Sequence, residues 1–248
     1  MGPCGEWWRT FCGAWGACYT VDKELKKWLN KSVTSSEFDK SSDDNLNGMN
    51  DKFWDLNKEK QDRMINAALK VFASNGYRKS STDEIVKLAQ ISKGLLFHYF
   101  ESKQGLYTFV YEYSAKYMQM EYERALSYGE TDFFILQSQL ELAKTQVMRN
   151  YPYMNEFLNQ AFLEEDAEIV HEVADVMDAY SACIANVYAR ADLSRFKQDV
   201  DPSKLLKIVL FTVDGLRSDH LRMGKCDPDA LYEETMEYLT MLRSNMMK

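Results

Sequence analysis

The sequence predicts an all-α protein, and three observations support that prediction. Apolar residues recur three and four positions apart through most of the chain after residue 58, which is the spacing of helices with one buried face. No run of alternating apolar and polar residues exceeds four positions, so no strand pattern emerges. Short polar stretches holding glycine or proline separate the periodic segments. Hydrophobic residues make up 46% of the chain, which is enough for a core.

Four helices are expected in the first part of the periodic region. Gly76 follows a strong apolar face and ends the first helix. Thr82 caps the second helix, and two acidic residues follow it in the first turn, where carboxylates suit the positive helix end. Ser92 and Ser102 cap the third and the fourth. The expected ranges are 58–76, 82–89, 92–100 and 103–128.

Five further helices are expected after residue 130. Pro152 breaks the first of them from the second, and Pro202 stands in a first-turn position that suits proline. Gly224 closes the fourth, and the last one runs almost to the C-terminus. The expected ranges are 132–150, 152–163, 165–192, 202–224 and 227–246.

Residues 1–57 differ from the rest in composition. Cys4, Cys12 and Cys18 are three thiols without a nearby histidine, one ligand short of a zinc site, so metal binding is only the alternative interpretation here. A Ser-, Asp- and Asn-rich stretch without periodicity follows and favours a disordered linker. We therefore expect residues 1–57 to be a disordered or non-native extension, with Met49 as an alternative start.

Charge is distributed unevenly along the chain. The formal net charge is −8, but residues 58–103 hold nine Lys and Arg against five Asp and Glu, a local charge of +4. A small basic module on an acidic body suits a protein that binds DNA at one end. The alternative is an ordinary solvated face, and charge alone does not decide between the two.

Cysteine usage and hydropathy indicate a cytoplasmic protein. The five cysteines are odd in number, and Cys183 and Cys226 stand alone in the body, so they do not form a disulfide framework. No run of about 18 apolar residues exists, which argues against a membrane span. The first residues lack the basic leader of a secretory signal.

The expected helix at residues 92–100 has an unusual surface. Leu96 and Phe100, four positions apart, can face a core, while a lysine, a histidine and several aromatic residues crowd the remaining positions. A helix this short with such an outer face suggests contact with another molecule. Preceded by the helix at 82–89 and a tight turn, it predicts a helix-turn-helix that presents its second helix to a DNA major groove.

These residues resemble a known family. A leading helix that ends in NGY, followed by STDEIVKLAQISKGLLFHYFESKQGLY, resembles the DNA-binding domain of the tetracycline-repressor (TetR) family over residues 58–117. The resemblance implies a helix-turn-helix DNA-binding domain at 58–103, and a helical ligand-binding and dimerisation domain at 104–248. It also implies a homodimer on a palindromic operator in double-stranded DNA, and a small-molecule effector that lowers DNA affinity.

The resemblance also assigns the residues that would contact DNA. Ser81 and Thr82 would hold backbone phosphates, and Tyr99 and Lys103 would clamp others. The residues in or along the major groove would be Lys93, Gly94, Leu95, Phe97 and His98.

Three positions depart from the family pattern. Gln90 stands where a glycine is usual, which costs about 1 kcal/mol if the residue is left-handed. Leu95 and Phe97 replace a hydroxylated residue and a tyrosine, which favours apolar contacts with thymine methyl groups.

The body suggests a dimer interface and a ligand pocket. The helix at 203–224 is apolar nearly all round, so with the last helix it is expected to form a two-fold four-helix interface; a central core helix is the alternative. Acidic residues at 121, 156 and 214 would favour a cationic or hydroxylated ligand if they point inward. The residues expected to line the pocket, unless they are plain core, are Met118, Tyr122, Tyr153, Phe157, Met177 and Tyr180.

An enzyme is the alternative from a different class. The three histidines, His98, His171 and His220, have no plausible nucleophile beside them, and no phosphate-binding glycine loop is present. A metal at His171 and its two glutamate neighbours is less favoured than a solvated acidic face. A helical protein that lost DNA binding is the other alternative. We expect a DNA-binding transcriptional regulator, a repressor that a small-molecule ligand releases from DNA, with no enzymatic activity, no cofactor and no metal.

Overall fold

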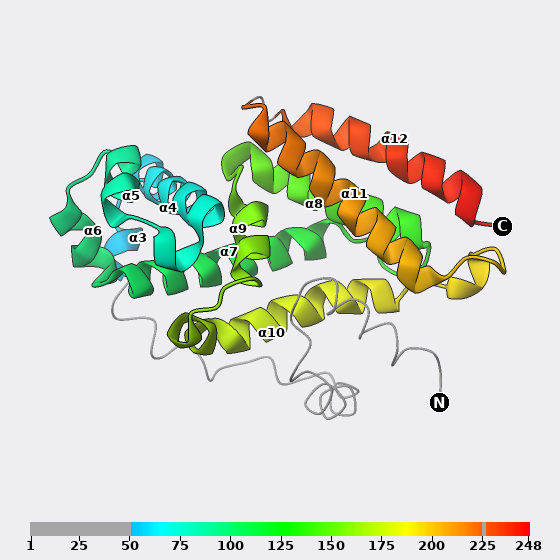
Figure 1. Cartoon of the computed structure of the whole chain (residues 1–248), viewed down its shortest axis with the longest axis horizontal. Coiled ribbons are helices and arrows are strands. Elements are labelled where there is room, and N and C mark those ends of the chain that lie inside the picture. Colours follow the sequence, from blue (N-terminus) through cyan, green and yellow to red (C-terminus); the bar gives the residue numbers. More distant parts are fainter. Residues whose placement is uncertain (1–50, 225–226) are drawn as a thin grey trace.

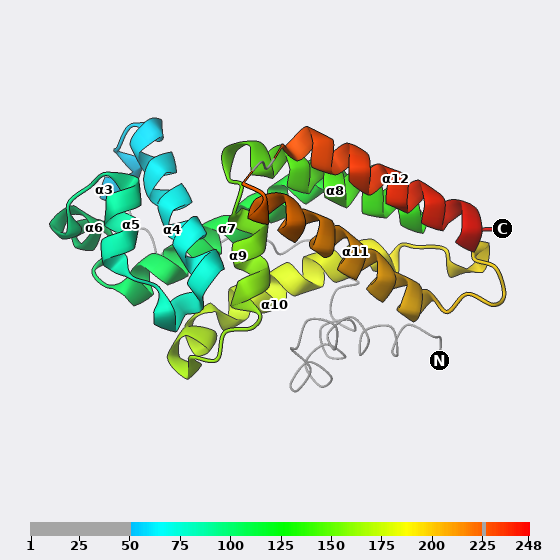
Figure 2. The same cartoon turned by 45° about the horizontal axis from the view of Figure 1, so that its top comes forward.

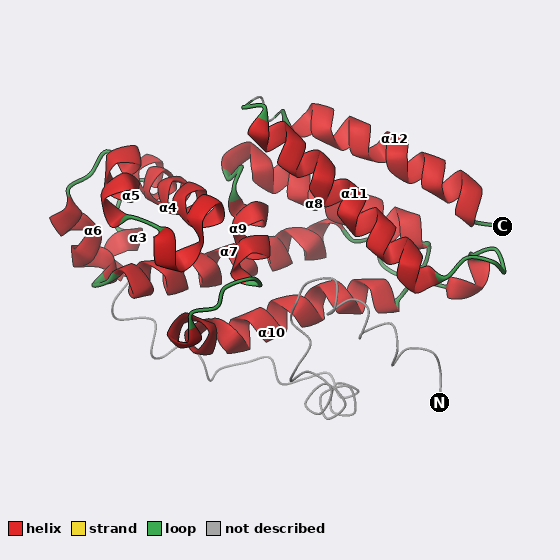
Figure 3. Ribbon diagram, in the orientation of Figure 1, coloured by secondary structure: helices red, strands yellow, loops and turns green. Residues whose placement is uncertain are grey.

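The computed structural model describes residues 51–224 and 227–248, and within them the chain is helical with no β-strand (Figures 1 and 3). This confirms the all-α prediction. The predicted ends of these helices lie within three residues of the observed ones. The helices are α3 Asp51–Trp54, α4 Lys58–Lys79, α5 Thr82–Ala89, α6 Lys93–Phe100, α7 Lys103–Ala125, α8 Phe133–Asn150, α9 Met154–Ala161, α10 Ala167–Ala189, α11 Pro202–Arg222 and α12 Pro228–Met246, with a short 3-10 turn at Leu193–Arg195.

The helices form two groups that α7 connects. Helices α3 to α6 gather at one end of the molecule, and α7 runs from that end into the middle of the body (Figures 1 and 2). In the body, α8 packs against both α7 and α12, while α9 stands against α4. A single hydrophobic core continues through both groups, from Phe53 and Phe72 to Leu239.

The end of α4 depends on a glycine. Gly76 has φ 66° and ψ −178°, a backbone conformation that a side chain would strain, so the regular helix bends there and a last turn reaches Lys79. The buried Ser80 follows as the C-cap, and its hydroxyl donates to the Val71 carbonyl. The predicted end of the first helix at Gly76 is therefore the position of this kink.

Side-chain caps and one strained residue shape the helix-turn-helix. Ser81, rather than the predicted Thr82, caps α5, because its hydroxyl accepts from the Asp83 N–H. Gln90 ends α5 in the left-handed region, at φ 55° and ψ 47°. Ser92 caps α6 as predicted, with its hydroxyl accepting from the Leu95 N–H at 3.2 Å.

Helix α6 turns into α7 at a close backbone contact. A Cβ on Gly105 would lie 2.3 Å from the carbonyl oxygen of Phe100, so no other residue fits there without a shift of the backbone. Ser102 caps α7 by accepting from the Gly105 N–H at 2.9 Å. The two helices are thereby held at a fixed angle.

The folded unit begins earlier than predicted. Residues 51–57 were expected to lie outside it, but Phe53 in α3 is fully buried, with its ring centroid 5.3 Å from that of Phe100 and 5.1 Å from that of Phe109. Gln61 bonds the carbonyl oxygens of Trp54 and Leu56. The predicted boundary at residue 57 is wrong for this segment. Residues 1–50, with their three cysteines and Met49, lie outside the described residues.

The body is fixed by two buried ion-pair clusters. The Asp132 carboxylate caps α8 and bonds Arg195 and Arg243 at 2.9 and 2.8 Å, which ties α8 to the turn after α10 and to α12. Arg217 of α11 is 2% exposed and binds Glu141 of α8 at 3.0 Å. Because a buried ion pair is stable only when both charges are matched, these contacts fix how the helices align.

In the part of the chain that the structure describes, no helix is both long enough and apolar enough to cross a lipid bilayer.

Replacement of Gln90 by glycine should stabilise the protein. A left-handed glutamine costs about 1 kcal/mol relative to glycine. We expect Gln90→Gly to raise the free energy of unfolding by that amount in urea titrations. Gln90→Ala, which keeps the strain, is the control and should bring no gain. Lower stability in Gln90→Gly would show that the Gln90 side chain stabilises the turn.

Asp132 should make the free energy of unfolding depend on pH in the acidic range. Burial alone would raise the pKa of its carboxyl, but the hydrogen bonds from Arg243 and the Ile135 N–H, with the charge of Arg195, hold that pKa below its ordinary value. The stabilisation is therefore present at neutral pH and is lost as pH falls below about 4.

The variant Asp132→Asn keeps a capping oxygen and loses the charge. We expect a loss of about 1 to 2 kcal/mol at pH 7, and a loss that shrinks towards acid pH, in thermal unfolding followed by circular dichroism. The exposed Asp229, paired with Arg149, provides the control Asp229→Asn, which should change little. An unchanged stability of Asp132→Asn at pH 7 would contradict the assignment.

Candidate nucleic-acid interface

Helix α6 has a buried side and an outer side, as predicted. Leu96 and Phe100 are 1% and 5% exposed and fix the helix to the core, while Lys93, Gly94 and His98 are exposed. Leu95 and Phe97 are half-buried, so each presents part of its surface outward. The five residues assigned to the major groove therefore all retain accessible surface on one short helix.

The exposed Gly94 is not required by the fold. A Cβ built there meets no atom within 4 Å, and the residue lies inside a regular helix, where glycine is unfavourable. Its lack of a side chain brings the backbone of α6 to the surface, which allows close approach of another molecule.

Lys93 has a partner within the chain. Its ammonium lies 2.8 Å from the Asp83 carboxylate of α5, and both side chains are at least half exposed. Ser81 stands at the start of the same helix and is exposed, with Thr82 half-buried beside it. The N-terminus of α5 and the outer face of α6 therefore lie next to each other.

Two of the residues that the resemblance assigned to phosphate contacts instead contact other parts of the chain. The Lys103 ammonium donates to the carbonyl oxygens of Tyr77, Arg78 and Ser80, at 2.9 to 3.4 Å. It also lies 4.3 Å above the Tyr77 ring. Such contacts stabilise the C-terminal end of α4, so the structure assigns this lysine a fold-stabilising contact in place of a free phosphate clamp.

Tyr99 is also more buried than expected. It is 8% exposed, and its ring centroid lies 6.0 Å from that of Phe53 in an edge-on contact. The phosphate-clamp assignment needed an accessible side chain, whereas most of this ring packs in the core. The resemblance assigned Tyr99 to a phosphate contact, whereas its side chain lies on the buried side of α6.

The helix-turn-helix is joined to the body by acidic residues that the sequence analysis missed. Glu164, between α9 and α10, accepts from the Tyr77 N–H at 2.8 Å. Asp166, the N-cap of α10, binds Arg78 at 3.2 Å, and that bond, with backbone N–H groups, lowers the pKa of its carboxyl. The Glu-Glu-Asp run before α10 was the only sequence signal for these contacts.

The six residues expected to line a ligand pocket are brought together only in part. Tyr122 and Tyr180 are buried and stacked, with hydroxyl oxygens 3.4 Å apart, and Met118 is fully buried. Phe157 packs against Phe72 of α4 and Tyr111 of α7, with ring centroids 6.0 and 6.2 Å apart. Tyr153 and Met177 are half-buried, and Tyr153 lies under Lys70 of α4, away from the tyrosine pair.

The acidic residues of the body are mostly paired. Glu121 binds Arg124 at 2.7 Å, and Asp214 binds Arg217 at 2.7 Å. Burial raises the pKa of Glu156, and the charge of Arg217 opposes that rise. The expectation that these acids would receive a cationic ligand is therefore not supported for Glu121 and Asp214, whose charges are already matched.

The described residues hold no group of three or more His, Cys, Asp or Glu side chains that could bind a metal ion. His220 instead lies 2.9 Å from Glu234, and the ring of His98 packs edge-on against Tyr99.

Comparison with known proteins identifies the region around α5 and α6. The family described as bacterial regulatory proteins, tetR family, matches residues 64–108. The transcriptional regulator YuxN of Bacillus subtilis is 49% identical over 49 residues, which are 20% of this chain and 17% of that protein. The regulator QacR of Staphylococcus aureus is 40% identical over 47 residues, which are 19% and 25% of the two chains.

A solved structure resembles the fold of most of the chain. A TetR family transcriptional regulator from Chloroflexus aurantiacus superposes with a TM-score of 0.51 at 21% identity, over 79% of this chain and 97% of that one. This likeness concerns the fold, whereas the identity to the two curated regulators spans no more than a quarter of their length. Residues 64–108 therefore match the tetR family of bacterial regulatory proteins, and the chain shares the fold of a TetR family regulator.

Proposed function

We propose that this protein is a DNA-binding transcriptional regulator, a repressor that a small-molecule effector releases from its operator. The observation that carries the proposal is the outer face of α6, where Lys93, Gly94 and His98 are exposed on a helix that the core fixes from behind. A helix presented in this way has the dimensions to enter a major groove. Such a regulator acts in the cytoplasm, where its DNA lies, and needs no catalytic site.

The contacts with DNA follow from the geometry of α5 and α6. Lys93, Phe97 and His98 face base edges, and the open surface at Gly94 lets the backbone approach the duplex. Ser81 and Thr82 bind a phosphate through the start of α5, whose free N–H groups attract anions. Lys103 and Tyr99 act indirectly, because they fix α7 and α6 to the rest of the domain.

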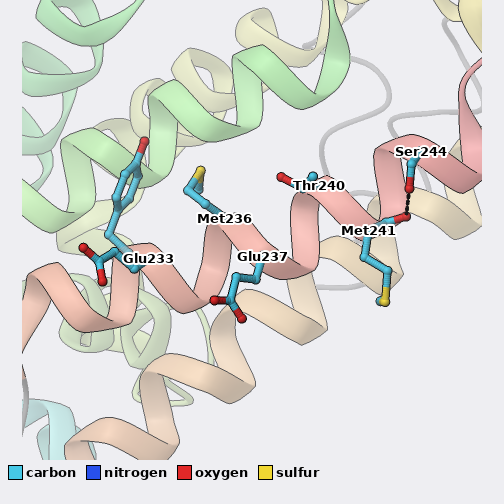
Figure 4. Close-up of a pocket in the computed structure, with 7 residues that line it drawn as sticks. Glu233, Met236, Glu237, Thr240, Met241 and Ser244 are labelled. Atoms are coloured by element: carbon cyan, nitrogen blue, oxygen red, sulfur yellow. Dashed lines mark hydrogen bonds between the residues drawn. The ribbon is translucent and has the colours of Figure 1, made fainter.

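In a homodimer, the second protomer supplies a second copy of α6, which can enter the major groove of the other half of the operator. Helices α11 and α12 lie side by side at the edge of the body (Figures 1 and 2), and both carry large exposed apolar side chains. Phe211 and Ile208 of α11 are 63% and 48% exposed, and Met241 of α12 is 53% exposed. A shallow, open hollow on α12 is lined by Met236 and Met241, with Glu233 and Glu237 beside them (Figure 4). Two such surfaces paired about a two-fold axis match a palindromic operator.

The effector acts through the contacts between the body and α4. Phe157 of α9 packs against Phe72, and Glu164 holds the Tyr77 N–H at the end of the same helix. A ligand that displaces α9 therefore moves α4, and with it the helix-turn-helix of each protomer. Such a ligand shifts DNA affinity only as far as it prefers one arrangement over the other.

Lys93 should contribute one ionic contact to DNA. The operator is first selected from a random duplex pool with the full chain. We then expect Lys93→Ala to reduce the slope of log affinity against log salt by about 1. Lys116, an exposed lysine in the second half of α7, gives the control Lys116→Ala with an unchanged slope. If no duplex is selected, or if Lys93→Ala keeps the full slope, the proposal fails.

The apolar surface on α11 should hold the dimer together. A charge at its centre removes apolar contact and buries an unpaired group, so Phe211→Glu should yield a monomer in sedimentation analysis and weaken operator binding at least about tenfold. Leu163, which is 61% exposed near α10, gives the matched control Leu163→Glu. A dimer that persists in Phe211→Glu, or that dissociates equally in Leu163→Glu, places the interface elsewhere.

A further inference from the structure

Three deeply buried side chains in the body each keep one polar atom without a hydrogen-bond partner. Among the described residues, only Tyr111, Asn155 and Arg217 are at least nine-tenths buried and yet keep a side-chain polar atom without a hydrogen bond. The atoms are the Tyr111 hydroxyl, the Asn155 amide nitrogen and the Arg217 Nε. All three can donate a hydrogen bond. Because an unsatisfied buried donor costs free energy, native proteins leave few of them without a reason.

The three donors belong to one neighbourhood. Asn159 lies one turn after Asn155 on α9, and its amide reaches Asp214, the partner of Arg217. Tyr111 packs against Phe157 of the same α9, with ring centroids 6.2 Å apart. The charge of Arg217 also opposes the rise that burial causes in the pKa of Tyr122 and Tyr180, the stacked pair beside Tyr111. Side-chain contacts thus link α9 to α11, α9 to α7 and α7 to α10.

The charges around this cluster are balanced. Glu141 binds Arg217 at 3.0 Å and Lys144 at 2.7 Å, and Asp214 binds Arg217 at 2.7 Å. A cation would therefore meet carboxylates that already have partners. An anion would meet Glu141 and Asp214 beside the guanidinium and would be repelled. The remaining acid, Glu156, has a pKa that burial raises and that the charge of Arg217 lowers.

The surrounding side chains are aromatic. The ring of Phe157 contacts that of Tyr111, and the rings of Phe162 and Tyr180 stack with their centroids 6.5 Å apart. Aromatic side chains pack well against flat apolar molecules, because ring faces and edges fit each other. A ligand for this cluster therefore has a ring system as its apolar part and hydrogen-bond acceptors as its polar part.

We propose that the effector is an uncharged molecule that carries a ring and an acceptor oxygen, such as an aryl ketone, bound by Tyr111, Asn155 and Arg217. This inference rests on the proposed regulatory function. It replaces the expectation of a cationic ligand, because the acids that suggested it are matched within the chain. Entry of the ring under α9 displaces Phe157 against Phe72, which is the contact between α9 and α4.

Four probes of one size separate the alternatives in calorimetric titrations of the full-length protein. They share a naphthalene ring and differ in the group attached to it: a methyl ketone, a carboxylate, an aminomethyl group and an ethyl group. We expect the ketone to bind at least about tenfold more tightly than the other three, since only it offers an uncharged acceptor. Tighter binding of the amine or the carboxylate overturns the inference. So does equal binding of all four, or binding of none, which would leave water as the partner of the donors.

Two variants test the residues. Tyr111→Phe removes a hydroxyl that has no partner, so it should leave the melting temperature unchanged and weaken ketone binding about tenfold. Tyr113→Phe is the matched control: it removes a hydroxyl bonded to Tyr151 at 2.8 Å, so it should lower the melting temperature and leave ketone binding unchanged. Full ketone affinity in Tyr111→Phe contradicts the assignment.

The same titrations with the selected operator present separate this inference from the proposed function. Ketone binding with the expected ranking but without any operator binding means that the regulatory function fails and the ligand site stands. Operator binding with a different ranking of the probes means that the regulator stands and the effector class is wrong.

Discussion

The peptide groups at the end of α4 are the point on which the arrangement of the whole molecule depends. The carbonyl oxygen of Tyr77 accepts from the Lys103 ammonium at the start of α7, and the N–H of Tyr77 donates to Glu164 of the α9–α10 connection. A single residue thus fixes the long connecting helix and the body to the same end of α4. Because Gly76 turns the backbone just before it, both polar groups point outward from a helix that would otherwise use them internally.

This joint explains how so short a helix as α6 is held. Two helical turns are not stable in isolation, so their order comes from packing. Leu96 and Phe100 supply the packing, Phe53 closes it from the other side, and the close contact of Gly105 with the Phe100 carbonyl fixes the angle to α7. The side chains on the outer face of α6 therefore contribute little to core packing. Their identity can vary with the molecule that the helix binds.

The sequence predicted the fold well wherever the signal was local. Helical spacing and capping serines placed nearly every helix, and the left-handed Gln90 was anticipated from the glycine usual at that position. The failures concern partners that lie far along the chain. A lone Phe53 in a polar stretch gave no periodic signal, and nothing near Lys103 indicates that carbonyl groups 25 residues away bind it. The pairing of Asp214 and Glu141 with Arg217 likewise depends on how α8 and α11 align.

The ion pair between Asp83 and Lys93 has a consequence for how this surface discriminates among polyanions. The carboxylate occupies the ammonium before any nucleic acid arrives, so a phosphate must compete with a partner that is already in place. A weak, purely ionic encounter gains little from that exchange. For the DNA binding proposed above, only a sequence that also fits the rest of α6 would recover the difference, so this internal competitor would increase the preference for a cognate site over other DNA.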